Sequence, residues 1–169
     1  MAWGRACIGV FGMSVIRHVT RDDITGMQGI LKNTSEFSGR DVECCLECLH
    51  ECVEGVEPTY KFICAVEDGS LAGFACYDTD TLADGVFEVY WVVVAPHKRK
   101  NGVGRQLLDQ VESEARKENA RMIAIETESG PNYENARRLY EKCGFASEAV
   151  LKDFYKKGED KVIYVKRIE

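Results

Sequence analysis

The sequence predicts an α/β protein in which helices cover both faces of one mixed β-sheet. Segments rich in β-branched and aromatic residues occur before and after segments whose apolar residues recur at helical spacing. Two pairs of these strand-like segments are joined by short polar turns, which predicts hairpins within the sheet. The resulting order, β-α-α-β-β-β-α-β-α-β-β, is not a regular alternation, so a doubly wound Rossmann domain is disfavoured.

The first half of the chain is expected to supply one strand, two helices and a hairpin. In order, these elements are a strand at residues 14–20, helices at about 22–32 and 41–53, and strands at 60–66 and 71–77. The acidic pair Asp22-Asp23 is typical of the start of a helix. Asp68-Gly69 is a turn signal, so the two strands that flank it should form a hairpin.

The second half is expected to alternate strands with helices before it ends in a hairpin. Its elements are a strand at 87–94, a helix from 103 to about 115, a strand at 121–126, a helix at about 136–143, and strands at about 147–155 and 162–166. Pro96 ends the long strand and Gly144 stops the second helix. The helix that begins at residue 103 has one apolar face, formed by Val103, Leu107, Leu108, Val111 and Ala115.

With 169 residues, of which 45% are hydrophobic and 30% charged, the chain has the size and composition of one soluble globular domain. Met13 is a more natural start for that domain than Met1. We therefore expect the domain at residues 13–169 and a loosely ordered extension at residues 1–12. The net charge of −6 argues against a nucleic-acid partner, which would require a basic face.

Eight cysteines would suggest disulfides in a short secreted chain. They are Cys7, Cys44, Cys45, Cys48, Cys52, Cys64, Cys76 and Cys143. The apolar stretch at residues 6–16 lacks a small-residue cleavage site and is too short to span a membrane. We therefore expect a cytoplasmic protein with reduced thiols and no membrane partner.

The segment from Val92 to Leu108 is the most informative part of the sequence. It leads from a strand into an amphipathic helix, and Gly102 and Gly104 allow the backbone to approach a ligand closely. The first N–H groups of a helix have no partner inside it and lie at the positive end of its dipole, so they suit a pyrophosphate. A Walker A loop and a dinucleotide fingerprint both fail, since the first needs Gly-Lys-Ser/Thr and the second needs a third glycine.

Two motifs resemble those of the GNAT superfamily of acyl-CoA-dependent N-acetyltransferases. The first is Arg-x-x-Gly-x-Gly at Arg99, Gly102 and Gly104, which a Val-x-Pro sequence precedes. The second is Asn-Ala-x-x-x-Tyr-x-x-x-Gly-Phe, from Asn135 to Phe145. The motifs occur in the family's order with one strand between them, and the resemblance covers roughly residues 14–168. It implies a sheet of six to seven strands, splayed between strands 4 and 5 and flanked by four helices.

The resemblance also implies acetyl-CoA as the acyl-donor substrate, with no metal. Backbone groups of Val92 and Val94 would bind the pantetheine arm, and one amide, with that of Val94 favoured, would polarise the thioester carbonyl. Asn135 would brace the cofactor from the second motif. The pyrophosphate would be held by Arg99 and by the amides of Lys100, Asn101, Gly102, Val103, Gly104 and Arg105.

A general base is expected because the attacking amine must be neutral. An alkylamine with a pKa near 10.4 is about 3 units from that state at pH 7. By resemblance Glu88 is the candidate, Asp84 is the next choice, and a solvated or ion-paired strand carboxylate is the alternative interpretation of Glu88. Regular alternation would place Glu88, Tyr90, Val92 and Val94 on one face of the strand, together with the cofactor.

Tyr140 matches the family's usual general acid, which protonates the departing thiolate. A phenol stays protonated at pH 7 and can donate to a thiolate. Core packing is the alternative, because Tyr140 shares a helical face with Ala136 and Cys143. No histidine lies near Cys143 in sequence to activate it, so we expect direct transfer in a ternary complex.

These features predict an enzyme that moves an acetyl or other short acyl group to a primary amine, on a small molecule or a peptide. The sequence leaves the identity of the acceptor open, and a homodimer is a further expectation of the resemblance. One alternative is an acyl-CoA-binding sensor without turnover. A second is a thiol or metal protein built on the cysteines between Cys44 and Cys52, although their spacing is helical and lacks a second paired knuckle.

Overall fold

The computed structural model describes residues 14–55, 60–79 and 82–168. The extension predicted at residues 1–12 lies outside the described residues. The strands are β1 (Val15–His18), β2 (Tyr60–Glu67), β3 (Ser70–Asp78), β4 (Val86–Val94), β5 (Met122–Glu128), β6 (Ala146–Lys156) and β7 (Glu159–Arg167). The helices are α1 (Ile24–Lys32), α2 (Gly39–Glu54), α3 (Val103–Lys117) and α4 (Glu134–Lys142), with short 3-10 turns at Arg21–Asp23, Pro96–Lys98 and Pro131–Tyr133.

The seven described strands form one sheet in the order β1-β2-β3-β4-β5-β7-β6. β4 and β5 are parallel, and the other neighbouring pairs are antiparallel. The turn between β2 and β3 has positive φ at both Asp68 and Gly69 (49° and 75°), as the hairpin prediction requires. The predicted mixed sheet with four flanking helices is therefore confirmed.

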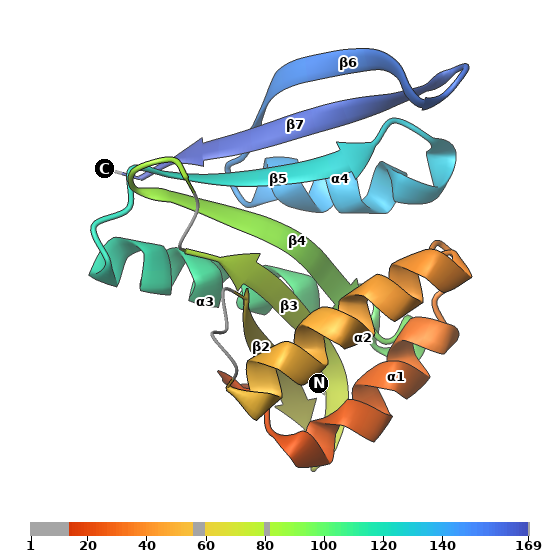
Figure 1. The fold of residues 1–169 in the computed structure, drawn as a ribbon, viewed down its shortest axis with the longest axis vertical. Coiled ribbons are helices and arrows are strands. Elements are labelled where there is room, and N and C mark those ends of the chain that lie inside the picture. The colour runs from red at the N-terminus through yellow and green to blue at the C-terminus, as the bar shows by residue number, and fades with distance from the viewer. Residues whose placement is uncertain (1–13, 56–59, 80–81, 169) are drawn as a thin grey trace, which may run out of the picture.

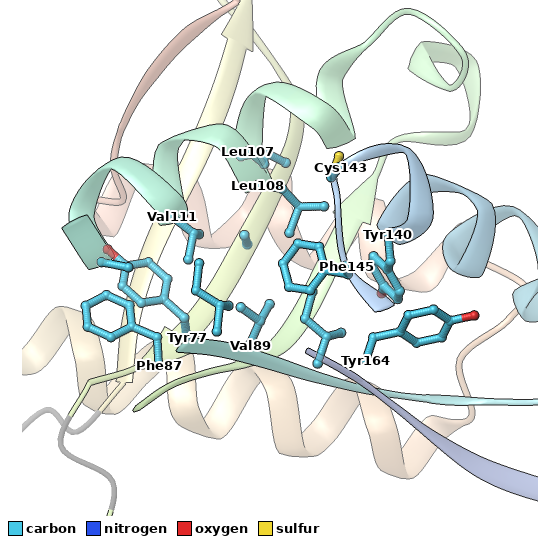
Figure 2. Close-up of a cluster of buried hydrophobic side chains, with 14 of the residues drawn as sticks. Tyr77, Phe87, Val89, Leu107, Leu108, Val111, Tyr140, Cys143, Phe145 and Tyr164 are labelled. Carbon is cyan, nitrogen blue, oxygen red and sulfur yellow. The ribbon is translucent and has the colours of Figure 1, made fainter. Parts of the chain in front are cut away.

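Helices lie on both faces of the sheet, each over its own apolar core (Figure 1). α1 and α2 bury Met27, Leu31 and Leu49 against Phe62 and Phe74. The opposite face holds α3 and α4, whose buried side chains pack with those of the sheet in the cluster drawn in Figure 2. Among the described residues, no helix is both long enough and apolar enough to cross a bilayer.

The sheet opens between β4 and β5, as the resemblance implied. The two strands pair only from Val86–Met122 to Val89–Ile125, although β4 continues to Val94 and β5 to Glu128. Beyond this point the two strands diverge, as their arrows in Figure 1 show. The opening leaves the end of β4 without a strand partner on its β5 side, and the site develops there.

Candidate active site

A cleft of about 680 Å³ lies where β4 and β5 diverge. This volume is within the range typical of small-molecule and cofactor sites. The end of β4 and the start of α3 contribute to its lining, and the end of β5 and the first turns of α4 contribute on the other side. The connection between α1 and α2 adds Thr34, Glu36 and Phe37. Segments on both sides of the opening between β4 and β5 therefore line the same cleft.

A β-bulge at Tyr90 interrupts β4 next to this opening. Trp91 pairs with Cys76 on β3, and Val89 pairs with the adjacent Tyr77, so Tyr90 is the extra residue. A bulge resets the alternation of side chains along a strand. Residues before and after Tyr90 therefore no longer follow a single two-residue period.

The bulge makes the predicted common face of Glu88 and the cofactor-binding valines wrong. Val89 is buried in the α3-side core, and Val92 and Val94 pack against the same core. Glu88, which adjoins Val89, therefore points to the α1–α2 face instead. Glu88 and the two valines lie on opposite faces of the sheet.

The phosphate loop, residues 99–105, presents a row of free backbone donors. Lys100 and Gly102 both have positive φ (65° and 84°), and Gly102 is the N-cap of α3. The N–H groups of residues 100–105 donate to no other described residue. Unpaired amides at the start of a 15-residue helix are the arrangement that binds phosphate groups.

The two glycines of the loop are required for different reasons. Gly102 is needed for its backbone conformation, because side chains disfavour a φ of 84° and a Cβ would meet only Gln106, at 3.9 Å. Gly104 allows close packing, because a Cβ there would lie 2.8 Å from a terminal methyl group of Leu139 on α4, which would have to shift, and 3.5 Å from Val94. The sequence argument attributed both glycines to ligand approach, whereas Gly104 also permits close contact between α3 and α4.

The basic side chains of this region are largely paired within the protein. The ammonium of Lys98 lies 2.9 Å from a carboxylate oxygen of Glu67, and the guanidinium Nε of Arg105 lies 3.6 Å from a carboxylate oxygen of Asp109. Within the described residues, Lys100 has no ion pair. The backbone is therefore the main source of anion-binding groups in the phosphate loop.

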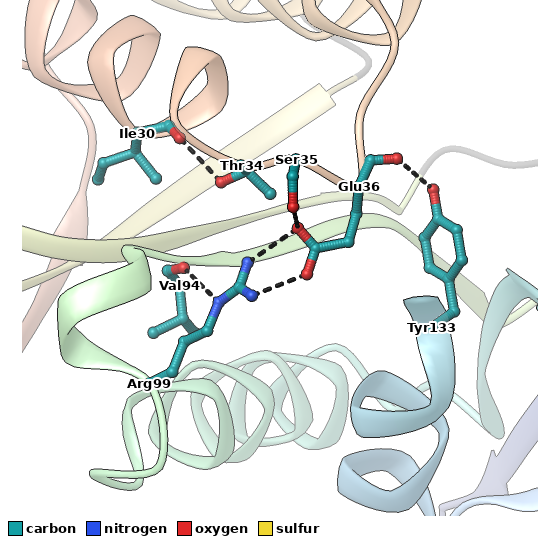
Figure 3. Close-up of polar contacts among 7 residues, drawn as sticks. All are labelled: Ile30, Thr34, Ser35, Glu36, Val94, Arg99 and Tyr133. Carbon is teal, nitrogen blue, oxygen red and sulfur yellow. Dashed lines mark hydrogen bonds and ion pairs between the residues drawn. The ribbon is translucent and has the colours of Figure 1, made fainter. Parts of the chain in front are cut away.

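Arg99, the first residue of the loop motif, is held by Glu36 (Figure 3). Its guanidinium donates to both carboxylate oxygens of Glu36, at 2.7 and 3.2 Å, and more weakly to the carbonyl of Val94 at 3.4 Å. This bidentate pair lowers the pKa of the Glu36 carboxyl below its ordinary value. The hydroxyl of Tyr133, which precedes α4, donates to the main-chain carbonyl of Glu36 at 2.9 Å. Glu36 thus joins the α1–α2 connection to both sides of the cleft.

Tyr140 lies on α4 and is only 6% exposed, yet it lines the cleft. Its ring packs edge-on against Tyr164 at 5.7 Å and beside Phe145 at 6.2 Å (Figure 2). Its hydroxyl has no hydrogen-bond partner in the described part of the chain. Burial raises the pKa of Tyr140, so the phenol remains protonated at neutral pH.

A family model described as "Acetyltransferase (GNAT) family" matches residues 31–145, well over half of the chain. The match includes both motifs, the phosphate loop and Tyr140. The chain belongs to the GNAT acetyltransferase family. It is therefore an N-acetyltransferase of the GNAT type, and acetyl-CoA is the acyl donor of this family.

Similar proteins support the assignment. N-acetyltransferase YsnE of Bacillus subtilis, described as uncharacterized, is 32% identical over 148 residues, which is 85% of this chain and 93% of the relative. A crystal structure of a GNAT-family protein from Desulfovibrio desulfuricans has a TM-score of 0.87 at 34% identity and covers 92% of this chain and 99% of its own. An aminoglycoside 6'-N-acetyltransferase complexed with coenzyme A shares the fold, with a TM-score of 0.73 at 20% identity over 92% of this chain and 97% of its own.

The cleft of this GNAT protein brings together ten of the twelve residues predicted for the site. These are Val92, Val94, Arg99, Lys100, Gly102, Val103, Gly104, Arg105, Asn135 and Tyr140. Asn101 and Glu88 do not line it. The carboxylate of Glu88 accepts a hydrogen bond from the hydroxyl of Tyr90 at 2.9 Å, and Tyr90 does line the cleft. Asp84, the second choice for the base, is exposed in the turn before β4.

Sequence reasoning missed Glu36, Tyr133 and the two carboxylates at the end of β5, Glu126 and Glu128, which all line the cleft. Glu36 and Tyr133 lie in connections and have no periodic spacing that could mark them. The acids of β5 did leave a signal, because residues two apart in a strand share a face. The sequence does not show which face of the strand lines the cleft, so this spacing can be interpreted only once the fold is known.

Two of the four cysteines of α2 are buried in the core beneath that helix, whereas Cys44 is exposed and Cys52 is half-buried. Cys45 and Cys48 are buried in the same cluster as Cys64 and Cys76 of the sheet. Burial raises the pKa of all four thiols, to about 11 for Cys48 and Cys64. A protonated thiol is a poor nucleophile and a poor metal ligand, and hydrophobic packing explains these positions.

Proposed function

We propose that the protein transfers an acetyl or other short acyl group from acyl-CoA to a primary amine, by direct attack in a ternary complex. One observation carries the proposal: a single cleft combines backbone amides at a helix start with the hydroxyl of the largely buried Tyr140, and none of these groups has a partner among the described residues. The amides suit the pyrophosphate of CoA, and the hydroxyl suits a leaving group that must gain a proton.

The backbone of the phosphate loop would hold the pyrophosphate, with Asn135 at the start of α4 on the other side of it. The end of β4, at Val92 and Val94, would hydrogen-bond the pantetheine arm through main-chain groups that β5 leaves unpaired. The amide of Val94 is the favoured donor to the thioester carbonyl, where charge develops during attack. Acetyl-CoA would supply the acyl group, and CoA would leave as a thiolate.

Tyr140 would donate its hydroxyl proton to that thiolate. Because burial raises the pKa of the phenol, the proton is present when it is needed. The absence of a partner among the described residues also leaves the hydroxyl free to turn toward the sulfur.

Glu88 would accept the proton of the amine, acting through the hydroxyl of Tyr90 or through water. Its position on the α1–α2 face supports this role rather than weakening it. An acceptor amine must approach the thioester from the side opposite the cofactor, so a base on the opposite face from Val92 and Val94 is on the side of the amine. The 2.9 Å hydrogen bond from Tyr90 links the carboxylate to the cleft.

The rival is an acyl-CoA sensor with no turnover. Steady-state kinetics with acetyl-CoA and a panel of primary amines, together with calorimetric binding of acetyl-CoA, separates the two. The proposal requires turnover that Y140F and E88Q reduce while acetyl-CoA still binds. Binding without turnover on any amine of the panel would favour the sensor.

The same proposal includes a homodimer in the cytoplasm. The homodimer draws support from β6, an edge strand on which Val150, Leu151 and Phe154 are exposed (46%, 45% and 51%). Light scattering of the purified protein tests the dimer, and a monomer at micromolar concentration would contradict it.

A further inference from the structure

The end of β5 provides a carboxylate for which the described residues supply no partner. Four acidic side chains line the cleft: Glu36, Asp41, Glu126 and Glu128. Glu36 is bound by Arg99, Glu126 lies 2.6 Å from Lys161, and Asp41 accepts hydrogen bonds from the amide and hydroxyl of Ser38 at 2.8 and 2.7 Å. For the carboxylate of Glu128, no ion pair or hydrogen bond occurs within residues 14–55, 60–79 and 82–168.

Two negative charges act on the carboxyl of Glu128, whereas the nearby guanidinium of Arg137 donates to main-chain carbonyls, that of Glu128 at 2.6 Å and that of Gly130 at 2.9 Å. Burial raises the pKa of this carboxyl above its ordinary value, and the charges of Glu159 and Asp41 raise it further. Lys156 offsets this in part, but its ammonium is 2.8 Å from Glu159. A positive charge brought into the cleft beside Glu128 would relieve both the burial and the repulsion.

Aromatic rings lie around the same end of the cleft. Tyr133 and Tyr155 line it together with Glu128 and Asp41. Burial raises the pKa of both phenols, and the charges of Glu128 and Asp41 raise it further. The neighbouring side chain of Lys161 already uses such surroundings, since its ammonium pairs with Glu126 and lies 4.0 Å from the ring centre of Phe154. Carboxylates combined with ring faces bind ammonium groups.

A second, independent feature indicates that a ligand belongs in this cleft. Tyr140 is more than nine-tenths buried, lines the cleft and leaves its hydroxyl without a partner in the described chain. The reacting group is expected near this hydroxyl and near Glu88, which is level with Ala124 across the β4–β5 pair. Glu128 is four residues farther along β5, roughly 13 Å at the rise of an extended strand.

From this arrangement we propose that the acceptor is an amine with a second cationic group, and that Glu128 binds this second group while the first amine is acylated. The proposal rests on the proposed acyl transfer and names its substrate class. Glu128 is then a residue of acceptor specificity, distinct from the base and the acid. A polyamine or a long diamine has this chemistry, whereas an amine that carries a carboxylate would be repelled.

The test compares two probes that differ by one charge, 1,8-diaminooctane and octylamine. Their dissociation constants are measured by calorimetry on the full-length protein saturated with CoA, so the readout does not depend on turnover. We expect the diamine to bind about tenfold or more tightly than the monoamine, since hydrogen bonds to charged groups are among the stronger polar contacts.

Three variants locate the effect. E128Q keeps the shape but removes the charge, and we expect the ratio of the two dissociation constants to fall toward one. E128D keeps the charge and should retain most of the preference. The control E148Q removes an exposed carboxylate that does not line the cleft, and it should keep the wild-type ratio. Calorimetric binding of acetyl-CoA to each variant checks that the cleft is intact.

Equal binding of the two probes by the wild-type protein, or an unchanged ratio in E128Q, would overturn the proposal. Failure of the underlying function gives a different result. If the diamine binds through Glu128 but is never acylated by acetyl-CoA, the cation site stands and the acyl transfer falls.

Discussion

On the α3 side, the cleft is lined by a short stretch of chain whose backbone amides have no partner among the described residues, whereas on the α1–α2 side the lining consists of side chains from separate segments. In the proposed function the first is the cofactor side, and it depends on two glycines and a helix start, which are local properties of one short stretch. The second is the acceptor side, and it depends on Glu36, Glu128 and Tyr133, which tertiary structure alone brings together. Backbone recognition is therefore encoded in contiguous sequence, while side-chain recognition is distributed along the chain and can change one residue at a time.

The largest expected effect on activity is at Tyr140, where the proposed transfer takes place. Y140F should lower kcat by about 100-fold to 10,000-fold, the usual range for loss of a general acid. The unfolding temperature should hardly change, because the hydroxyl has no partner to lose. Y164F is the matched control, since its hydroxyl bonds to Glu141 outside the cleft. If Y140F lowers kcat no more than Y164F does, Tyr140 has a packing role and is not the general acid.

Disturbing the backbone of the cofactor side should come next in size. G102V places a β-branched residue at a φ of 84°, which costs about 1–2 kcal/mol and turns the amides away from the pyrophosphate. We expect acetyl-CoA to bind about tenfold more weakly, as measured by calorimetry. K100A, which removes an unpaired cation but no amide, should weaken binding less. If K100A has the greater effect, side chains rather than backbone hold the cofactor.

The link between the two sides should have a smaller and more selective effect. E36Q removes the charge that holds Arg99, and we expect the KM for the acceptor to rise about threefold to tenfold, in line with a partly exposed ion pair. Acetyl-CoA affinity should change little, because the loop amides remain. S35A, which removes a neighbouring hydroxyl that donates weakly to Glu36, is the control. An equal loss of affinity for the acceptor and for acetyl-CoA would contradict the division of the cleft into two sides.

The smallest effect is expected from pH. Arg17 lowers the pKa of Asp23, at the start of α1, from 3.8 to about 2. A depressed carboxyl pKa contributes stability above the unfolded value, and that stability is lost as the pH falls from about 4 through 2. The free energy of unfolding, measured by thermal unfolding at each pH, should therefore fall by up to about 2 kcal/mol more in the wild type than in D23N over this interval. Parallel curves would show that the pair does not anchor α1.

The sequence predicted most of the fold, because hairpins, helical periodicity and stop residues are local. It also selected residues that the structure brings into one cleft, in the loop at 99–105 and at Tyr140, because their motifs are contiguous. It did not predict the face on which Glu88 lies, since the bulge at Tyr90 leaves no mark in the strand's composition. Nor did it find Glu36, because the contact with Arg99 spans 63 positions and depends on how α1 packs.

The bulge at Tyr90 also decides how this strand should be aligned with those of relatives. With the extra residue, a carboxylate four positions before Val92 emerges on the opposite face of the sheet. In a relative whose strand is regular, the spatial counterpart of Glu88 stands three positions before the matching valine. Whether an alignment of β4 includes a one-residue gap therefore decides on which face of the sheet a glutamate is placed. Without that gap, the same residue type in one alignment column can lie on opposite faces of the sheet in two proteins.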